Sequence, residues 1–198
     1  AHTVQIGKVK ITKNVSFDEI RENVYENPVR CAVPESAVLM EKEILKAAEE
    51  RASVGGVVEG LALGVPVGLG EPVFDSLDSD IAKMLFNIPA VKGVEFGAGF
   101  KAASLKGSEN NDEYAIQKGK VVSLTNNAGG ILGGISTGMP VVLRIAFKPT
   151  SSITKRQKTV DLEKMEETEI KLMGRHDPCV VPRAVPVVES CLAFVLAD

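Results

Sequence analysis

The sequence predicts an α+β fold in which helices are layered against a largely antiparallel sheet. Stretches of alternating apolar and polar residues, typical of strands, recur along the 198 residues. Between them lie stretches whose apolar residues recur with helical spacing. In the first half of the chain the expected order is strand, helix, helix, strand, helix, strand, which is typical of helices packed on an antiparallel sheet.

The first strand and the first helix are expected close to the beginning of the chain. Residues 3–12 alternate as a strand does. Ser16, followed three residues later by Glu19, resembles a capping box that begins a short helix reaching Glu26. Pro28 then ends this part of the chain.

The longest amphipathic helix is predicted for residues 34–53. Good helix formers carry apolar residues at helical spacing there, and Gly55 and Gly56 are expected to end the helix. Residues 57–69 are predicted to form a strand that carries an exposed Glu59.

Ser79 is expected to cap a further helix over residues 80–87, followed by a strand over residues 91–97. Residues 99–127 are polar and irregular, so they are predicted to be a long loop. Loops of this length often serve a function.

The last part of the chain is predicted to hold a clear strand at residues 141–147 and a charged hairpin or loop at residues 154–169. A final helix is expected over residues 183–197, with Pro186 in its first turn. Residues 1–198 are interpreted as a single α+β domain.

Composition and charge exclude several classes of function. A net charge of -3 argues against a nucleic-acid partner. The longest apolar stretch, residues 54–70, is interrupted by Glu59 and by glycine and proline, which argues against a membrane span. Three irregularly spaced cysteines, Cys31, Cys179 and Cys191, favour a reducing cytoplasm and roles as small core residues.

A triplet of an arginine, a histidine and an aspartate stands shortly before the final helix. Arg175 can bind a phosphate or carboxylate through its planar set of donors. His176 and Asp177 can each accept or donate a proton. The alternative is a solvated turn, or a helix cap with an ion pair.

A glycine-rich segment at residues 125–140, TNNAGGILGGISTGMP, excludes side chains from five positions within ten residues. Such glycines let a backbone approach a flat or phosphorylated ligand and direct N–H groups at an anion. The alternative is a flexible loop without a ligand. The segment matches no dinucleotide or P-loop fingerprint.

The turn KPTSSI at residues 148–153 follows the predicted strand directly. Lys148 supplies a positive charge and Pro149 fixes the turn. Thr150, Ser151 and Ser152 supply hydroxyl groups, so the turn suits a phosphate. The alternative is an ordinary Ser/Thr-rich turn at the end of a strand.

Taken together, these segments resemble the chorismate synthase family over nearly the whole chain, from about residue 4. The segments that carry the resemblance, in the family's order and spacing, are SDIAKMLFNIPAVKGVEFGAGF at 79–100, KGSENNDEY at 106–114, NNAGGILGGISTGMP at 126–140, KPTSSI at 148–153 and GRHDPCVVPRAVPVVES at 174–190.

The resemblance implies a lyase of the shikimate pathway and aromatic amino acid biosynthesis. Its reaction would be the anti 1,4-elimination of phosphate from 5-enolpyruvylshikimate 3-phosphate, with reduced FMN as catalytic cofactor and no net redox change. It further implies a β-α-β sandwich fold and a cytoplasmic tetramer.

The family's flavin contacts, as the resemblance implies, fall on Pro89 and Ala90, Gly133, Lys148 through Ser152, and Arg175. Asp177 would lie near the flavin and assist proton removal. His176 is left open between a packing role and a catalytic one. Arg183 and Glu189 on the last helix are expected to be structural.

Family members are nearly twice as long and carry a GESHG motif and a second histidine motif that are missing here. The chain is therefore expected to be the C-terminal portion of such an enzyme and to be inactive alone. The competing hypothesis is a non-catalytic subunit that binds a phosphorylated ligand through Lys148 and Gly133.

Overall fold

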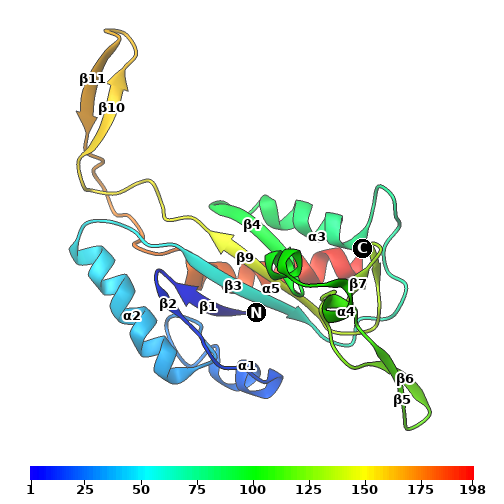
Figure 1. Ribbon diagram of the computed structural model, residues 1–198. Coiled ribbons are helices and arrows are strands. Elements are labelled where there is room, and N and C mark those ends of the chain that lie inside the picture. The colour runs from blue at the N-terminus through cyan, green and yellow to red at the C-terminus, as the bar shows by residue number, and fades with distance from the viewer. The chain divides into compact units, whose positions relative to one another are not determined.

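A computed structural model describes residues 1–198, except for the side chain of Lys120, and it confirms the α+β fold class (Figure 1). One sheet has five strands in the order β2-β1-β3-β9-β4. Three further pairs, β5-β6, β7-β8 and β10-β11, each form a small sheet of their own.

Helices and strands follow the chain in this order: β1 (His2–Ile6), β2 (Val9–Lys10), α1 (Phe17–Asn23), α2 (Pro34–Glu49), β3 (Gly56–Ala62), α3 (Leu77–Phe86), β4 (Val91–Phe96), the 3-10 helix η1 (Gly99–Ser104), α4 (Gly107–Asn110), β5 (Tyr114–Gln117), β6 (Lys120–Ser123), β7 (Ile131–Leu132), β8 (Ile135–Ser136), β9 (Val141–Phe147), β10 (Gln157–Asp161), β11 (Glu166–Ile170) and α5 (Val181–Ala197).

The chain divides into two compact units, and the divisions fall inside β1, β3, β9 and α5. Unit 1 consists of Ala1–His2, Val58–Ala146 and Ala184–Asp198. Unit 2 consists of Thr3–Val57 and Phe147–Arg183. The expectation that residues 1–198 form a single domain stays a prediction.

The core of unit 1 lies where α5 covers β3 and β9. A Cβ placed on Gly60 of β3 would meet Val188 and Leu192 of α5 and Leu143 of β9, so the absence of a side chain brings this helix close to the sheet. Helix α3 packs beside β4 and buries its inner face. Its fully or nearly fully buried residues are Leu77, Ile81 and Leu85.

The core of unit 2 is built around α2, which packs beside β2. Met40 at its centre is fully buried, and Pro34 occupies the first turn, where a missing N–H leaves no helical bond unmade. The capping box predicted at the start of α1 is confirmed, because the side chains and backbone N–H groups of Ser16 and Glu19 bond reciprocally.

Two helix ends differ from the sequence prediction. Helix α2 ends at Glu49, before the two glycines, because Arg51 takes a positive φ of 55° and the N–H of Ala52 bonds back to the carbonyl of Ala47. Helix α3 begins at Leu77, with Ser76 rather than Ser79 in the N-cap position. The two hydroxyl groups bond to each other at 2.7 Å.

Three further predictions are corrected. Residues 3–12 form the hairpin β1-β2, because Gly7 turns the chain with a φ of 54°. Residues 99–127 are not irregular throughout, since they hold η1, α4 and the hairpin β5-β6 (Figure 1). Pro186 lies in the interior of α5, which starts earlier than predicted. By contrast, the strand at residues 141–147 and a charged hairpin, β10-β11, are confirmed.

Candidate functional site

Unit 2 brings the predicted phosphate turn next to the Arg-His-Asp triplet. The turn at 148–152 leaves the end of β9, and the hydroxyl of Thr150 donates to the backbone carbonyl of Asp177 at 3.2 Å. From the other side, the hydroxyl of Ser53 donates to the carbonyl of Thr150 at 2.6 Å. Two segments far apart in sequence are thereby fixed to each other.

A cavity of about 230 Å³ lies in unit 2 between these segments and the end of α2. Ser152 of the turn and Arg175 of the triplet both line it. Lys148 and Ser151 are exposed and so remain accessible to a ligand. The other lining residues are Ala48, Arg51, Ala52, Ile153, Thr154, Gly174, His176 and Pro178.

Asp177 is held by an ion pair, a feature that the alternative interpretation of the triplet includes. Its Oδ2 atom lies 3.0 Å from Nη1 of Arg183, on the first turns of α5. The carboxylate is about a third exposed, so one partner orients it while solvent or a ligand can reach it. Arg183 therefore positions Asp177, in addition to the structural role that was expected.

His176, which stands between Arg175 and Asp177 in the chain, is partly buried. Its Nε2 atom is buried and has no hydrogen-bond partner among the described residues. Gly174 lies near the same edge of the ring, since a Cβ built there would lie 3.9 Å from Nε2. Next along the chain, burial raises the pKa of the Cys179 thiol to about 11, so this cysteine is a core residue rather than a nucleophile.

In unit 1, the glycine-rich segment forms the hairpin β7-β8, with Gly133 and Gly134 at its turn. Gly133 has a φ of 60° and faces open space, whereas a Cβ on Gly134 would collide with Ser76. The carbonyl of Gly134 accepts a bond of 2.9 Å from the N–H of Leu77 at the start of α3. The exposed backbone of Gly133 is thus presented on a fixed turn.

Pro89 and Ala90 follow the other end of α3. Because the helix has 10 residues, its two ends lie about 15 Å apart. Unit 1 therefore does not bring these two residues next to Gly133. Ala90 has a positive φ of 74°, which gives this turn an unusual backbone.

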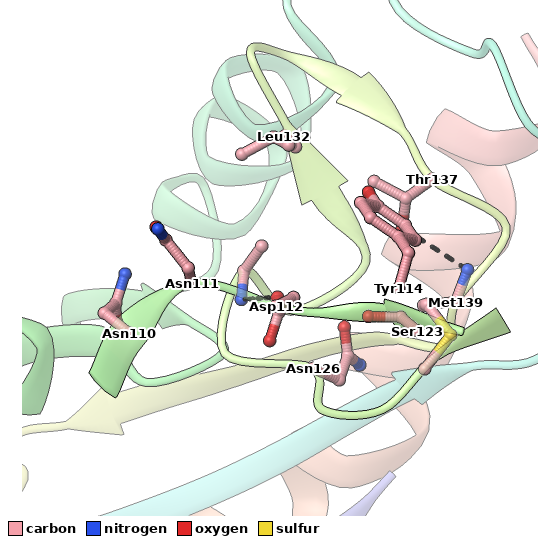
Figure 2. A pocket seen from close by; sticks show the side chains of 10 residues that line it. Asn110, Asn111, Asp112, Tyr114, Ser123, Asn126, Leu132, Thr137 and Met139 are labelled. Atoms are coloured by element: carbon pink, nitrogen blue, oxygen red, sulfur yellow. Dashed lines mark hydrogen bonds between the residues drawn. The ribbon is translucent and has the colours of Figure 1, made fainter. Parts of the chain in front are cut away.

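A second cavity, of about 310 Å³, lies beside the glycine-rich segment in unit 1 (Figure 2). Tyr114 and Thr137 lie on one side of it in the view of Figure 2, and Asp112 and Asn126 on the other. Among the described residues none of its lining side chains is cationic and one, Asp112, is acidic, so the lining does not suit a phosphate. Its remaining lining residues are Asn110, Asn111, Ser123, Ala128, Leu132 and Met139.

Asp112 has a structural task in this cavity. One oxygen accepts bonds from the hydroxyl of Thr125 at 2.6 Å and the N–H of Asn127 at 2.7 Å, and the other accepts from the N–H of Ala128 at 2.9 Å. Burial alone would raise the pKa of Asp112, but these bonds lower it below its ordinary value. The carboxylate therefore ties the loop before β5 to the glycine-rich segment.

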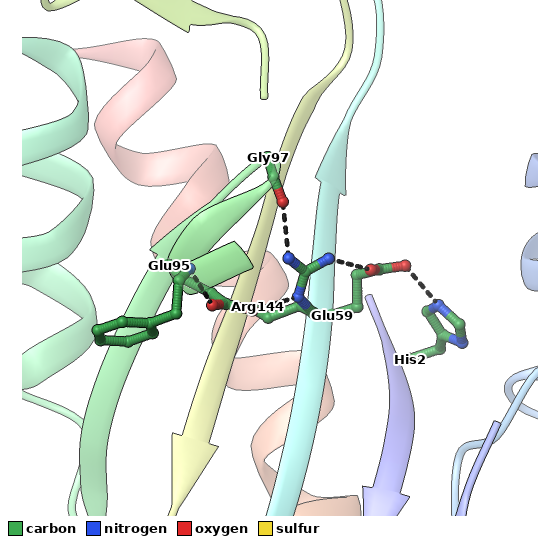
Figure 3. A network of polar contacts seen from close by, with 6 residues as sticks. His2, Glu59, Glu95, Gly97 and Arg144 are labelled. Carbon is green, nitrogen blue, oxygen red and sulfur yellow. Dashed lines mark hydrogen bonds and ion pairs between the residues drawn. The ribbon is translucent and has the colours of Figure 1, made fainter. Parts of the chain in front are cut away.

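A network of polar side chains crosses unit 1, and the sequence interpretation missed it (Figure 3). Glu59 was expected to be exposed, but it is largely buried and lies between two partners. His2 Nε2 lies 3.2 Å from one of its oxygens, and Arg144 Nη1 lies 3.5 Å from the other.

Arg144 carries the network on to β4 and the turn after it. Its Nε donates to Glu95 at 2.5 Å, and its Nη2 donates to the carbonyl of Gly97 at 2.6 Å. The next residue, Ala98, donates its N–H to the carbonyl of Asn127 at 2.7 Å. The network thus reaches the beginning of the glycine-rich segment. The signal that could have revealed it is one charged residue inside each of two apolar strands, β3 and β9.

The donors around the cavity of unit 2 fit the phosphate of a flavin mononucleotide. They combine the guanidinium group of Arg175 with the hydroxyl groups of Ser152 and Thr154, and the exposed ammonium group of Lys148 lies on the same turn as Ser152. No cluster of metal-binding side chains occurs within the described part of the chain. None of its helices combines the length and the apolar character that a membrane crossing requires.

Comparisons with known proteins match the whole chain to one family. The family model for chorismate synthase matches residues 1–198. A curated chorismate synthase of Methanosarcina mazei is 54% identical over 197 residues, and that of Methanothermobacter thermautotrophicus is 57% identical over 198 residues. Both alignments cover 100% of this chain but only 54% and 53% of the relatives.

The fold agrees with that result. A solved structure described as a crystal structure of chorismate synthase superimposes with a TM-score of 0.80 at 32% identity, covering 100% of this chain and 55% of that one. The chain thus spans about half the length of the relatives it matches. With the match of all its residues to the family model, the chain belongs to the chorismate synthase family.

Proposed function

We propose that the protein carrying this chain forms chorismate by the anti 1,4-elimination of phosphate from 5-enolpyruvylshikimate 3-phosphate, with reduced FMN as its cofactor. The observation that carries this proposal is the junction in unit 2, where Thr150 bonds to the backbone of Asp177 and where Ser152 and Arg175 line one cavity. The turn proposed to bind phosphate and the residue proposed to accept the proton thus lie on two segments that are bonded to each other.

In this proposal the turn from Lys148 to Ser152 and the guanidinium of Arg175 bind the phosphate of FMN. Charge-assisted bonds of this kind are the strong ones in proteins, and the hydroxyl groups add direction. The exposed backbone of Gly133, and the turn at Pro89 and Ala90, supply further flavin contacts. When bound, the reduced flavin supplies an electron-rich ring that favours departure of the phosphate.

Asp177 is the proposed proton acceptor. In the elimination a C–H bond and a C–O bond of the substrate break, a carbon–carbon double bond forms, and the phosphate leaves with the electron pair, so no net oxidation occurs. The proton must pass to a base, and a positioned carboxylate supplies one. Arg183, 3.0 Å from Asp177, fixes the direction in which the carboxylate accepts it.

Assembly and location belong to the same proposal. The family membership supports a tetramer, and three free cysteines, two of them buried, support a reducing cytoplasm. A subunit that only held a phosphorylated ligand would use the same turn, so turnover is what distinguishes the two functions.

The test is chorismate formation from 5-enolpyruvylshikimate 3-phosphate under anaerobic conditions, with and without reduced FMN. We expect product only with the reduced flavin. Lys148→Ala should raise the Kd for FMN by about tenfold, since a charge-assisted bond contributes about 1.5–3 kcal/mol. Lys158→Ala, on the β10-β11 hairpin, is the matched control and should leave the Kd unchanged. Absence of product with reduced FMN present would leave only the binding function.

A further inference from the structure

Arg51, which the sequence interpretation passed over, lies on the same cavity of unit 2 as Arg175. The cavity therefore collects two guanidinium groups, the imidazole of His176 and the hydroxyl groups of Ser152 and Thr154. Among the described residues that line it, none is acidic. Neither Arg51 nor Arg175 forms an ion pair with a carboxylate in the described structure. A cavity with this lining carries positive charge that no carboxylate of the described structure pairs with, and it suits a dianion.

The backbone holds Arg51 in an unusual conformation at the end of α2. Its φ of 55° lies in the left-handed region, which disfavours residues other than glycine. Its N–H bonds to the carbonyl of Ala48 at 3.0 Å, and that of Ala52 bonds to the carbonyl of Ala47 at 2.9 Å. The negative end of the helix dipole lies here and favours a cation. A strained residue that persists next to a cavity is typical of a functional position.

His176 provides a second, independent observation. Its Nε2 atom is buried without a partner, and leaving a buried polar atom unpaired costs free energy. The side chain lines the same cavity as the two arginines. An acceptor oxygen placed in the cavity would satisfy this nitrogen when it carries hydrogen.

We infer that Arg51 and His176 complete a binding site for a phosphate dianion, together with Arg175 and Ser152. This inference rests on the proposed function, because that function brings two phosphates to the protein. One is the phosphate group of FMN and the other is the inorganic phosphate that the elimination releases. Both present the same tetrahedral set of acceptor oxygens.

The deciding variant is Arg51→Gly. It removes the guanidinium group, while glycine suits the positive φ, so thermal unfolding should show no loss of stability. Lys46→Ala is the matched control, because it removes one positive charge from the last turn of the same helix without touching the cavity. Binding of FMN, riboflavin and inorganic phosphate is measured separately in the protein that carries this chain.

If the site holds the flavin phosphate, Arg51→Gly weakens FMN binding by about tenfold and leaves riboflavin, which has no phosphate, within about twofold. If the site holds free phosphate, the variant weakens binding of inorganic phosphate by a similar factor and leaves FMN unchanged. Lys46→Ala changes none of these affinities. Equal weakening of FMN and riboflavin, or no change for FMN and phosphate alike, would overturn the inference.

His176 is tested by a pair of variants. His176→Gln can place an amide nitrogen near the position of Nε2, whereas His176→Asn cannot reach it. Phosphate-dependent binding should survive in the first and fall in the second. Loss of FMN binding in Lys148→Ala without any effect of Arg51→Gly would remove the inference and leave the proposed function standing.

Discussion

Gly97 and Gly119 both have positive φ angles, 54° and 75°, but their surroundings differ. A Cβ on Gly97 would collide with backbone atoms of Asn127 and Gly129, whereas one on Gly119 would meet nothing. At Gly97 the turn after β4 lies directly against the glycine-rich segment. The close approach of these two backbones is therefore what requires glycine there.

Replacement by alanine separates these two effects. Gly119→Ala should cost about 1–2 kcal/mol in free energy of unfolding, from the backbone conformation alone. Gly97→Ala should cost about 1–3 kcal/mol more, because the added carbon must displace backbone. Urea unfolding measures both values. Equal losses in the two variants would show that the backbones do not approach each other as described.

At the scale of the strand, β3 and β9 each hold one charged residue among apolar ones, Glu59 and Arg144. Each of these side chains has charged or polar partners. Burial alone would raise the pKa of Glu59, but His2 and Arg144 lower it below its ordinary value. A carboxyl whose pKa is lowered in the folded state stabilises the fold above its unfolded pKa. That contribution is lost as the pH falls.

We therefore expect Glu59 to contribute to acid unfolding. Its stabilising effect should be fully present at neutral pH and should decline as the pH falls below about 4.5. Glu59→Gln should flatten the dependence of the unfolding free energy on pH in that range. Glu71→Gln, outside the network, is the control. A Glu59→Gln profile parallel to that of the parent protein would contradict this role.

Most elements could be predicted from the sequence, because local patterns determine them. The alternation in residues 141–147 and the Ser16 and Glu19 capping pair both gave the observed structure. The end of α2 was placed too late, because an arginine with a positive φ carries no sequence signal. The hairpin β5-β6 was missed, since a polar composition hides short strands.

The candidate site could be predicted in part for the same reason. Motifs identified the Lys148 turn and the triplet, and the structure joins the two in unit 2. Partners distant in sequence could not be foreseen, because only the fold brings them together. Arg51, far along the chain from Ser152 and Arg175, lies on the same cavity as these two residues.

At the scale of the whole molecule, unit 2 contains the phosphate turn, the two arginines and Asp177, whereas unit 1 contains Gly133 and the turn at Pro89 and Ala90. The chain spans about half the length of the relatives it matches, and the reaction is proposed for the protein that carries it. Within that protein, the proposed division of tasks is that Lys148, Arg175 and their neighbours bind and Asp177 accepts the proton.

The most direct test of this division is the steady-state rate of chorismate formation by Asp177→Asn with saturating reduced FMN. The account predicts that kcat falls by about 100-fold or more, because a general base is removed, while the Kd for FMN stays within about threefold of the parent value. A variant that turns over at the parent rate would contradict the assignment of Asp177.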